Sequence, residues 1–186
     1  MRTFLAVPLP ERLQRQLARE AGRLRPLLPG VRWVRAGTVH LTLLFLGEVA
    51  AERIPALEGL AGPACAAVPA DRLPVRGMGC FPERGPVRVL WVGVEDVRGT
   101  LTRLRDALGQ CARSLQLPGP EGVLRPHLTL GRARRGLRRA QVQPFLDAAG
   151  AFDDLPVEQC VLFRSTLGPG GARHDPLQRF ALGADA

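Results

Sequence analysis

Short segments with a strand-like or a helical spacing of apolar residues cover most of this chain. Residues 2–9 form an apolar run suited to a strand, and the segment after Pro10 has a helical period. The apolar positions of that segment lie three or four residues apart: Leu13, Leu17, Ala21 and Leu24. The chain is therefore predicted to open with a strand followed by an amphipathic helix.

The next segments favour strands on both sides of one more helix. Residues 31–49 are rich in β-branched and apolar residues and predict two strand pieces, whereas residues 51–68 predict a helix interrupted by proline and glycine. Residues 72–81 and 85–95 then predict a strand pair, because the turn-forming sequence PERGP joins them.

The second half begins with a helix predicted over residues 100–115, with Thr100 as its cap. Its apolar stripe consists of Leu101, Leu104, Leu108, Cys111 and Leu115. The arginine-rich residues 132–139 indicate an exposed basic loop, and residues 139–152 indicate another helix.

Two further strands are predicted to close the chain, at residues 157–166 and 176–183, with a glycine-rich loop at 168–175 between them. Strands that alternate with helices over short turns are typical of the α+β class with mostly antiparallel pairs. The tetrapeptide HLTL occurs once in each half, at residues 40–43 and 127–130. We therefore expect residues 1–186 to form one domain of two pseudo-symmetric lobes, each a sheet flanked by helices, with the active site in the cleft between them.

Composition excludes several classes of protein. No apolar run approaches the roughly 18–20 residues that a membrane helix needs, and the N-terminus lacks the features of a signal peptide, so we expect a cytoplasmic protein without a membrane partner. The four cysteines are scattered without a CxxC pair, and no sequence motif indicates a metal site or a cofactor. The net charge of +9 indicates an anionic partner, although the use of arginine for all 26 basic residues reflects a high-GC genome as well.

The repeated HLTL tetrapeptide suggests a particular chemistry. Side chains alternate faces along a strand, so His40 and Thr42 share one face, as do His127 and Thr129, while the leucines anchor the other face in a core. Two imidazoles can act as proton donor and proton acceptor, and threonine hydroxyls and a nearby arginine can hold phosphate oxygens. This set suits hydrolysis of a phosphodiester without a metal.

Other catalytic motifs are not supported by the sequence. The chain has two serines and no GxSxG, which disfavours a serine hydrolase, and its GPGG run is not followed by the GK[ST] of a P-loop.

Both motifs resemble those of the two-histidine phosphoesterase superfamily, and in particular of the bacterial RNA 2′,3′-cyclic phosphodiesterase family, formerly called 2′-5′ RNA ligases. The similarity rests on RTFLAVPLP, on VHLTLLFLGEV, on RPHLTLGRA and on the closing segment LFRSTLGPGGARHDPLQRFAL. The resemblance implies a bilobal α+β fold and metal-independent opening of an RNA 2′,3′-cyclic phosphate to a 2′-phosphomonoester. It also implies that His40 is the proton donor and His127 the proton acceptor, with Arg132 beside the phosphate.

Three positions depart from the family pattern. Leu44 stands where a basic residue is frequent, and His174 stands where an aromatic tyrosine is expected. Arg132 lies five residues after His127, which gives it the wrong parity for the same strand face unless the strand ends or bulges near Gly131. Phe4, Phe45 and Trp33 are candidates for stacking a base, but strand aromatics are more often in the core, and Phe45 shares the parity of the motif leucines.

The sequence leaves alternatives to this interpretation. The same site can run in reverse as a 2′-5′ RNA ligase that joins tRNA half-molecules, or act on small cyclic nucleotides or 2′-5′ oligoadenylates. A non-catalytic RNA-binding module is a further alternative, since the arginines between Arg132 and Arg139 can follow an RNA backbone. The expected partner is an RNA with a cyclic phosphate end, or a tRNA fragment or small nucleotide, and the protein is expected to act as a monomer.

Overall fold

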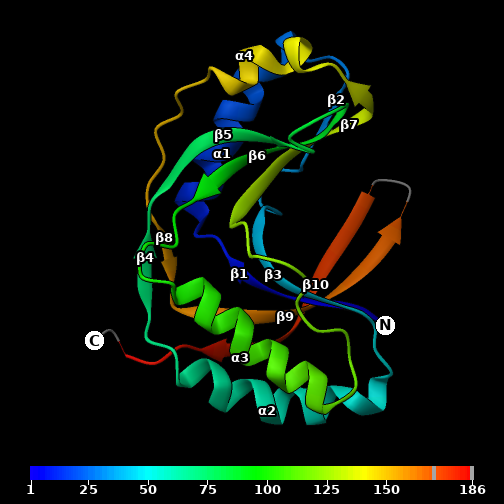
Figure 1. Ribbon diagram of the computed structural model, residues 1–186, viewed down its shortest axis with the longest axis vertical. Helices are drawn as coiled ribbons and strands as arrows, with labels where there is room; N and C mark the ends of the chain where they lie inside the picture. Colours follow the sequence, from blue (N-terminus) through cyan, green and yellow to red (C-terminus); the bar gives the residue numbers. More distant parts are fainter. Residues whose placement is uncertain (169–170, 185–186) are drawn as a thin grey trace.

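The computed structural model describes residues 1–168 and 171–184 of the chain. Two four-stranded antiparallel sheets, one two-stranded sheet and the surrounding helices make up the described part of the fold (Figure 1). The predicted α+β class with antiparallel sheets flanked by helices is confirmed.

The helices and strands alternate along the chain. The strands are β1 (Arg2–Pro8), β2 (Val31–Trp33), β3 (His40–Glu48), β4 (Asp71–Leu73), β5 (Val75–Phe81), β6 (Val87–Val94), β7 (His127–Leu137), β8 (Leu155–Val157), β9 (Gln159–Gly168) and β10 (Gly171–Ala181). The α-helices are α1 (Glu11–Leu24), α2 (Ile54–Ala66), α3 (Thr100–Ser114) and α4 (Gln143–Leu146), and three short 3-10 turns lie at Arg25–Leu27, Ala51–Arg53 and Arg139–Val142.

The two large sheets do not correspond to the two halves of the sequence. The first has the order β10-β9-β1-β3 and joins the two ends of the chain, and the second has the order β2-β7-β6-β5. Each sheet nevertheless contains one HLTL strand, β3 in the first and β7 in the second, and these two strands contact each other. Each sheet thus combines strands from both halves of the chain, which ties the two sheets into one structure.

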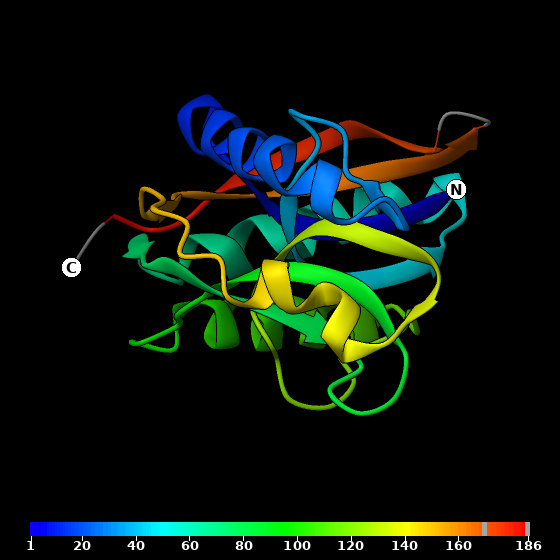
Figure 2. The same ribbon diagram turned by 90° about the horizontal axis from the view of Figure 1, so that it is seen from above.

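Helices cover the sides of the sheets that face away from each other. In Figure 1, α2 and α3 lie below the first sheet, and α1 and α4 lie beside the second. The helix α3 packs on α2 and β3, and α4 packs on β5. The view from above shows α1 crossing over the strands that close the chain (Figure 2). The apolar stripe predicted for α1 is buried throughout, so burial of this face against the sheets is what positions the helix.

Three sequence predictions are corrected by the fold. The basic residues 132–137 belong to β7 and are not a loop, because the strand pairs with β2 up to Ala133 and with β6 up to Leu137. The helix predicted at 139–152 is only a 3-10 turn followed by the four-residue α4. Residues 171–175 of the predicted glycine-rich loop lie in β10 and pair with β9, while residues 169–170 lie outside the described residues.

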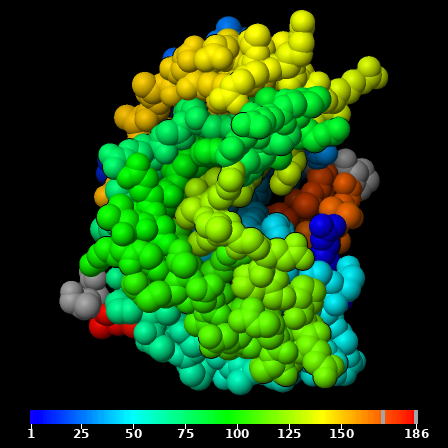
Figure 3. All heavy atoms as spheres, in the orientation of Figure 1, coloured from blue at the N-terminus to red at the C-terminus, as the bar shows by residue number. Residues whose placement is uncertain are grey.

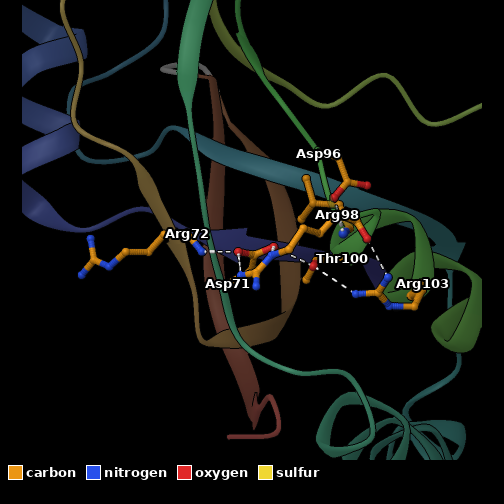
Figure 4. A network of polar contacts seen from close by, with 7 residues as sticks. Asp71, Arg72, Asp96, Arg98, Thr100 and Arg103 are labelled. Carbon is orange, nitrogen blue, oxygen red and sulfur yellow. Dashed lines mark hydrogen bonds and ion pairs between the residues drawn. The ribbon is translucent and has the colours of Figure 1, made fainter. Parts of the chain in front are cut away.

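A buried carboxylate fixes the start of α3 and corrects the predicted cap. Thr100 does not cap the helix; its hydroxyl donates to Asp71 Oδ2 at 2.8 Å, and Asp71 also accepts from the Arg98 guanidinium and from the backbone N–H of Arg72 at 2.7 Å (Figure 4). The first turn is capped instead by Asp96, whose carboxylate accepts the backbone N–H of Leu101 at 2.9 Å. The hydrogen bond between Thr100 and Asp71 joins α3 to β4 across 29 residues of sequence.

Within the described residues, no helix is both long enough and apolar enough to cross a membrane.

Candidate active site

The two HLTL strands have the same burial pattern over their first six residues. From His40 to Phe45 and from His127 to Arg132, the residues are in turn half-buried, buried, half-buried, buried, buried and exposed. The two consecutive buried positions mark an irregularity in the strand pairing. On β3 the partner of β1 jumps from Leu44 to Thr42, and on β7 the partner of β6 jumps from Gly131 to Thr129. Each motif is therefore followed by a β-bulge at the same place.

This bulge reverses the side-chain alternation after each motif. Arg132 consequently lies on the same face as His127 and Thr129. A bulge near Gly131 is what the sequence analysis required for Arg132 to belong to the site. The bulge on β3 likewise directs the Phe45 side chain to solvent, where it is 62% exposed. The expectation that Phe45 lies in the core is therefore wrong. The two equivalent positions thus add a guanidinium to one histidine and an aromatic ring to the other.

His40 is held by its own strand and by aromatic rings. Its Nδ1 lies 3.0 Å from the backbone oxygen of Thr38. Because a carbonyl only accepts, Nδ1 carries the hydrogen and Nε2 is left for chemistry. The rings of Phe4 and His174 lie 4.9 Å and 5.1 Å from the His40 ring, and the His174 ring meets it edge-on. The fold therefore allows His40 little rotation.

His127 is held in the same manner on the other sheet. Its Nδ1 lies 2.7 Å from the backbone oxygen of Arg125, again two residues earlier in the chain. The Phe81 ring meets the His127 ring edge-on at 5.1 Å, and the Trp91 ring lies 6.2 Å away. Both histidines thus expose Nε2, and a matching pair of nitrogens suits one proton acceptor and one proton donor.

The electrostatic environment disfavours the charged form of both imidazoles. The pKa of His40 is lowered to about 4, mainly by burial. The hydrogen bond to Thr38 raises this pKa, and the charges of His174, Arg132 and His127 lower it by smaller amounts. Burial also lowers the pKa of His127, with a further contribution from Arg132. Arg132 and His127 therefore lie within electrostatic reach of His40, which connects the two strands in one site.

The five predicted site residues occupy comparable places on the two strands. The side chains of Thr42 and Thr129 lie one strand period after their histidines and are half-buried, and Arg132 is exposed. Thr129 is paired across the sheet with Trp91, and Thr42 with Ala6. In the space-filling view, a recess opens between the yellow-green β7 and the orange β9–β10 hairpin (Figure 3). The roles of the five residues remain predictions.

The remaining candidate aromatic residues differ in exposure. Phe4 is buried and packs on the rings of Phe45 and Phe163, and Trp33 is half-buried beside Phe145. Of the three predicted to stack a base, only Phe45 has an exposed ring.

Sequence reasoning missed three aromatic neighbours of the histidines: Phe81, Trp91 and Phe163. They come from strands far from the motifs in sequence, and strand parity alone gives no signal for them. His174, which the sequence left without a role, contacts both His40 and Phe4 from β10. Its Nδ1 is buried and has no hydrogen-bond partner among the described residues.

No group of three or more histidine, cysteine, aspartate or glutamate side chains within residues 1–168 and 171–184 is placed to hold a metal ion. The polar groups beside the two histidines are instead hydroxyl and guanidinium groups, which are hydrogen-bond donors suited to an anion.

Known proteins resemble this chain in sequence and in structure. The sequence model of the LigT-like phosphoesterase family matches residues 7–91. An RNA 2′,3′-cyclic phosphodiesterase of Thermus thermophilus is 35% identical over 188 residues, which cover 98% of this chain and 90% of the relative. A protein of the same description from Escherichia coli K12 is 33% identical and covers 97% of this chain and 96% of its own length.

Solved structures agree with this similarity. The crystal structure of TT0787 from Thermus thermophilus superposes with a TM-score of 0.82 at 30% identity, and the match covers 100% of both chains. The crystal structure of E. coli LigT complexed with 3′-AMP superposes with a TM-score of 0.81 at 29% identity, and the match covers 97% of both chains.

Proposed function

Because this chain belongs to the LigT-like phosphoesterase family, we propose that it hydrolyses the terminal 2′,3′-cyclic phosphate of RNA to a 2′-phosphomonoester. The observation that carries the proposal is the matched pair of histidines. Each one donates Nδ1–H to the carbonyl two residues before it and presents Nε2 from a bulged strand.

The reaction needs one histidine neutral and the other charged. His127 Nε2 accepts a proton from water, and the water oxygen attacks the phosphorus atom. The bond between phosphorus and the 3′ oxygen breaks, and the His40 imidazolium donates its Nε2 proton to that oxygen. The products are a 2′-phosphate and a 3′-hydroxyl, and the two histidines have exchanged protonation states. Each proton transfer by a positioned group contributes on the order of 10²- to 10⁴-fold in rate.

Three donors hold the phosphate in this proposal. The hydroxyls of Thr42 and Thr129 donate to the non-bridging oxygens, and the Arg132 guanidinium adds a charge-assisted contact. Support comes from the bulges, which turn Arg132 to the same face as His127 and Thr129. These groups stabilise the charge of the phosphate without a metal. All five site residues belong to one chain, so a monomer suffices for the reaction.

The proposed partner is the cyclic phosphate end of an RNA, with tRNA fragments included. The exposed arginines of β7 and the residues after it support a contact with the RNA backbone: Arg132, Arg134, Arg135, Arg138 and Arg139. We further place the protein in the cytoplasm. The support is that all four cysteines are free thiols and three of them are buried, as suits a reducing compartment.

The test uses a short RNA that ends in a 2′,3′-cyclic phosphate, in buffer with EDTA. The wild-type protein is expected to produce a 2′-phosphate end, identified because a general phosphomonoesterase removes it and a 3′-specific phosphatase does not. His40→Gln and His127→Gln are each expected to reduce kcat by a factor on the order of 10² or more, because glutamine keeps a polar side chain but transfers no proton. Turnover that persists in both variants, or that disappears in EDTA and returns with a divalent metal, contradicts the proposal.

Arg132 has a matched control on the same strand. Arg132→Gln is expected to lower kcat/KM by roughly 10- to 100-fold, the value of a hydrogen bond to a charged group. Arg135 is also exposed on β7 but is assigned no contact with the phosphate, so Arg135→Gln is expected to leave the hydrolysis of a cyclic mononucleotide unchanged. Equal effects of the two substitutions show that Arg132 acts only through the general charge of the surface. Incubating tRNA half-molecules with the protein separates ring opening from ring-opening ligation, because only ligation produces a longer RNA.

A further inference from the structure

A hollow of about 220 Å³ adjoins His127 on the second sheet. Its walls are formed by six residues: Phe81, Glu83, Trp91, Arg125, Pro126 and His127. Since His127 itself is part of the wall, a group bound in the hollow lies directly next to the reacting phosphate. The phosphate contacts proposed above leave this space unused.

The floor of the hollow is aromatic and rigid. The rings of Phe81 and Trp91 lie 5.1 Å apart with an angle of 37° between their planes. Gly79 lies opposite Trp91 on β5, and a Cβ at Gly79 would overlap the indole ring. The indole therefore lies across the bare backbone of Gly79 and cannot turn in that direction. Flat aromatic surfaces of this kind stack nucleic-acid bases of any sequence.

The rim of the hollow carries one positive and one negative charge. The Arg125 guanidinium forms an ion pair with the Glu83 carboxylate, and both side chains are mostly exposed. Glu83 belongs to the turn between β5 and β6, and its backbone oxygen accepts from Arg139 at 3.4 Å. The backbone oxygen of Arg125 holds His127, so the rim is connected to the catalytic imidazole by two peptide units.

Every base presents a donor beside an acceptor, but guanine alone offers one carboxylate two adjacent donors, with an acceptor next to them for an arginine. Guanine presents O6 and N7 as acceptors, and next to them N1–H and N2–H₂ as donors. Arginine pairs with the former and a carboxylate with the latter. Adenine places the N1 acceptor where guanine has N1–H, which would oppose the carboxylate and leave it without a hydrogen bond.

We propose that this hollow binds the base of the nucleotide that carries the cyclic phosphate, and that Glu83 and Arg125 select guanine. The base stacks on Phe81 and Trp91, the carboxylate of Glu83 accepts from N1–H and N2–H₂, and Arg125 donates to O6. This inference rests on the proposed hydrolysis for its place in a reaction, although base binding itself can be measured without turnover.

The first experiment compares kcat/KM for the 2′,3′-cyclic phosphates of guanosine and adenosine. Guanosine is expected to be preferred by roughly 5- to 150-fold, the range that one bidentate contact to a base edge provides. Glu83→Gln is expected to reduce this preference to within about threefold, because the amide can rotate to present a donor to adenine N1. The matched control is Glu95→Gln, since Glu95 also pairs with an arginine, Arg76, at the other end of the β5–β6 pair. A wild-type ratio near one, or a ratio that is unchanged in Glu83→Gln, overturns the proposal.

The second experiment measures binding without chemistry. The chain has two tryptophans, so in Trp33→Phe the fluorescence reports on Trp91 alone. Titration with 2′-GMP is expected to quench this fluorescence at a Kd at least fivefold lower than that for 2′-AMP, and Glu83→Gln is expected to remove the difference. Equal Kd values for the two nucleotides, or no quenching, overturn the proposal.

Two further results separate the possible failures. Phe81→Ala is expected to weaken 2′-GMP binding by at least fivefold, whereas weakening by Phe45→Ala alone assigns the base to the exposed ring on β3 and overturns the hollow. Selective quenching by 2′-GMP in a protein that opens no cyclic phosphate refutes the proposed hydrolysis and leaves the base site intact. Rapid hydrolysis with no base preference refutes the base site and leaves the hydrolysis intact.

Discussion

Because the pKa of His40 is lowered in the free protein, we predict that phosphate binding raises it. The pKa falls from 6.5 to about 4, mainly because burial disfavours the charged ring. At 1.36 kcal/mol for each pKa unit, this corresponds to about 3 kcal/mol against the imidazolium. In the free protein at neutral pH, only about one His40 in a thousand carries a proton, yet a proton donor needs one.

A bound phosphate is expected to offset this penalty. One negative charge at about 4 Å from the ring, with an effective dielectric constant of about 20, favours the imidazolium by about 4 kcal/mol. The attraction is as large as the cost of burial, so the pKa of His40 is expected to rise back toward its ordinary value when phosphate binds. In the proposed mechanism, binding of the substrate therefore favours the charged form of His40, the proposed donor to the leaving oxygen.

Nuclear magnetic resonance tests this prediction directly. The chain has three histidines, so three Cε1–H signals are expected, and single His→Gln variants assign them. In the free protein the His40 signal is expected to titrate near pH 4, and saturating inorganic phosphate is expected to move the midpoint upward. The His174 signal serves as an internal comparison, since burial lowers the pKa of His174 too.

The pH dependence of turnover gives an independent measurement. The proposed mechanism requires free enzyme in which His40 is charged and His127 is neutral, a state that is lost above the higher of the two pKa values. Both pKa values are lowered, so kcat/KM is expected to fall with rising pH already below about pH 6.5. The profile of kcat, which reports the bound state, is expected to extend to higher pH. The reasoning is refuted if free His40 titrates at its ordinary pKa, or if phosphate leaves its midpoint unchanged.

Three further predictions concern single substitutions. Asp71→Asn is expected to lower the free energy of unfolding by about 1–3 kcal/mol in urea denaturation at neutral pH, the value of hydrogen bonds to a charged group. Because the Arg98 hydrogen bond holds the pKa of Asp71 low, this stability is present above about pH 4 and is lost as the pH falls through the folded pKa. A difference between variant and wild type that persists in acid contradicts the charge-based explanation. Gly79→Ala is expected to lower the Tm and shift the tryptophan emission, because the new Cβ would overlap the Trp91 ring. In the control Gly59→Ala, the new Cβ has no atom within 4 Å, and the change is expected to stabilise the protein by about 0.5–1 kcal/mol. Similar effects of both changes would argue against the packed indole. His174→Phe keeps a ring beside His40 and removes a charge that lowers the pKa of His40. The titration midpoint of His40 is therefore expected to rise slightly, while kcat/KM still falls with rising pH. An unchanged midpoint would show that the two rings do not interact electrostatically.

Much of the local structure could be predicted from the sequence, because it depends on residues close together in the chain. The stripe of α1 follows from apolar residues one helical turn apart, and the strand of each HLTL follows from alternation. That alternation also assigns the leucines to the core and His40, Thr42, His127 and Thr129 to the opposite face. The family resemblance added the expected reaction, and the comparisons bear out that family.

Errors in the prediction arose where local patterns give the wrong length or parity. The arginines after the second motif are typical of a loop by composition, but backbone pairing with β6 keeps residues 132–137 in β7. Strict alternation placed Phe45 on the core face and made the predicted role of Arg132 depend on a bulge near Gly131, because alternation alone does not reveal a bulge. In both strands the bulge is visible only in the register against the neighbouring strand.

The sequence by itself determined the two histidine–threonine pairs, since both members of each pair lie two residues apart on one strand. Only the tertiary structure decided what surrounds them. His174 reaches His40 because β10 joins the sheet of β3 through β9 and β1, and Phe81 reaches His127 because β5 joins the sheet of β7 through β6. The order of strands in a sheet depends on the burial of all its faces together, and no short segment of sequence contains that information.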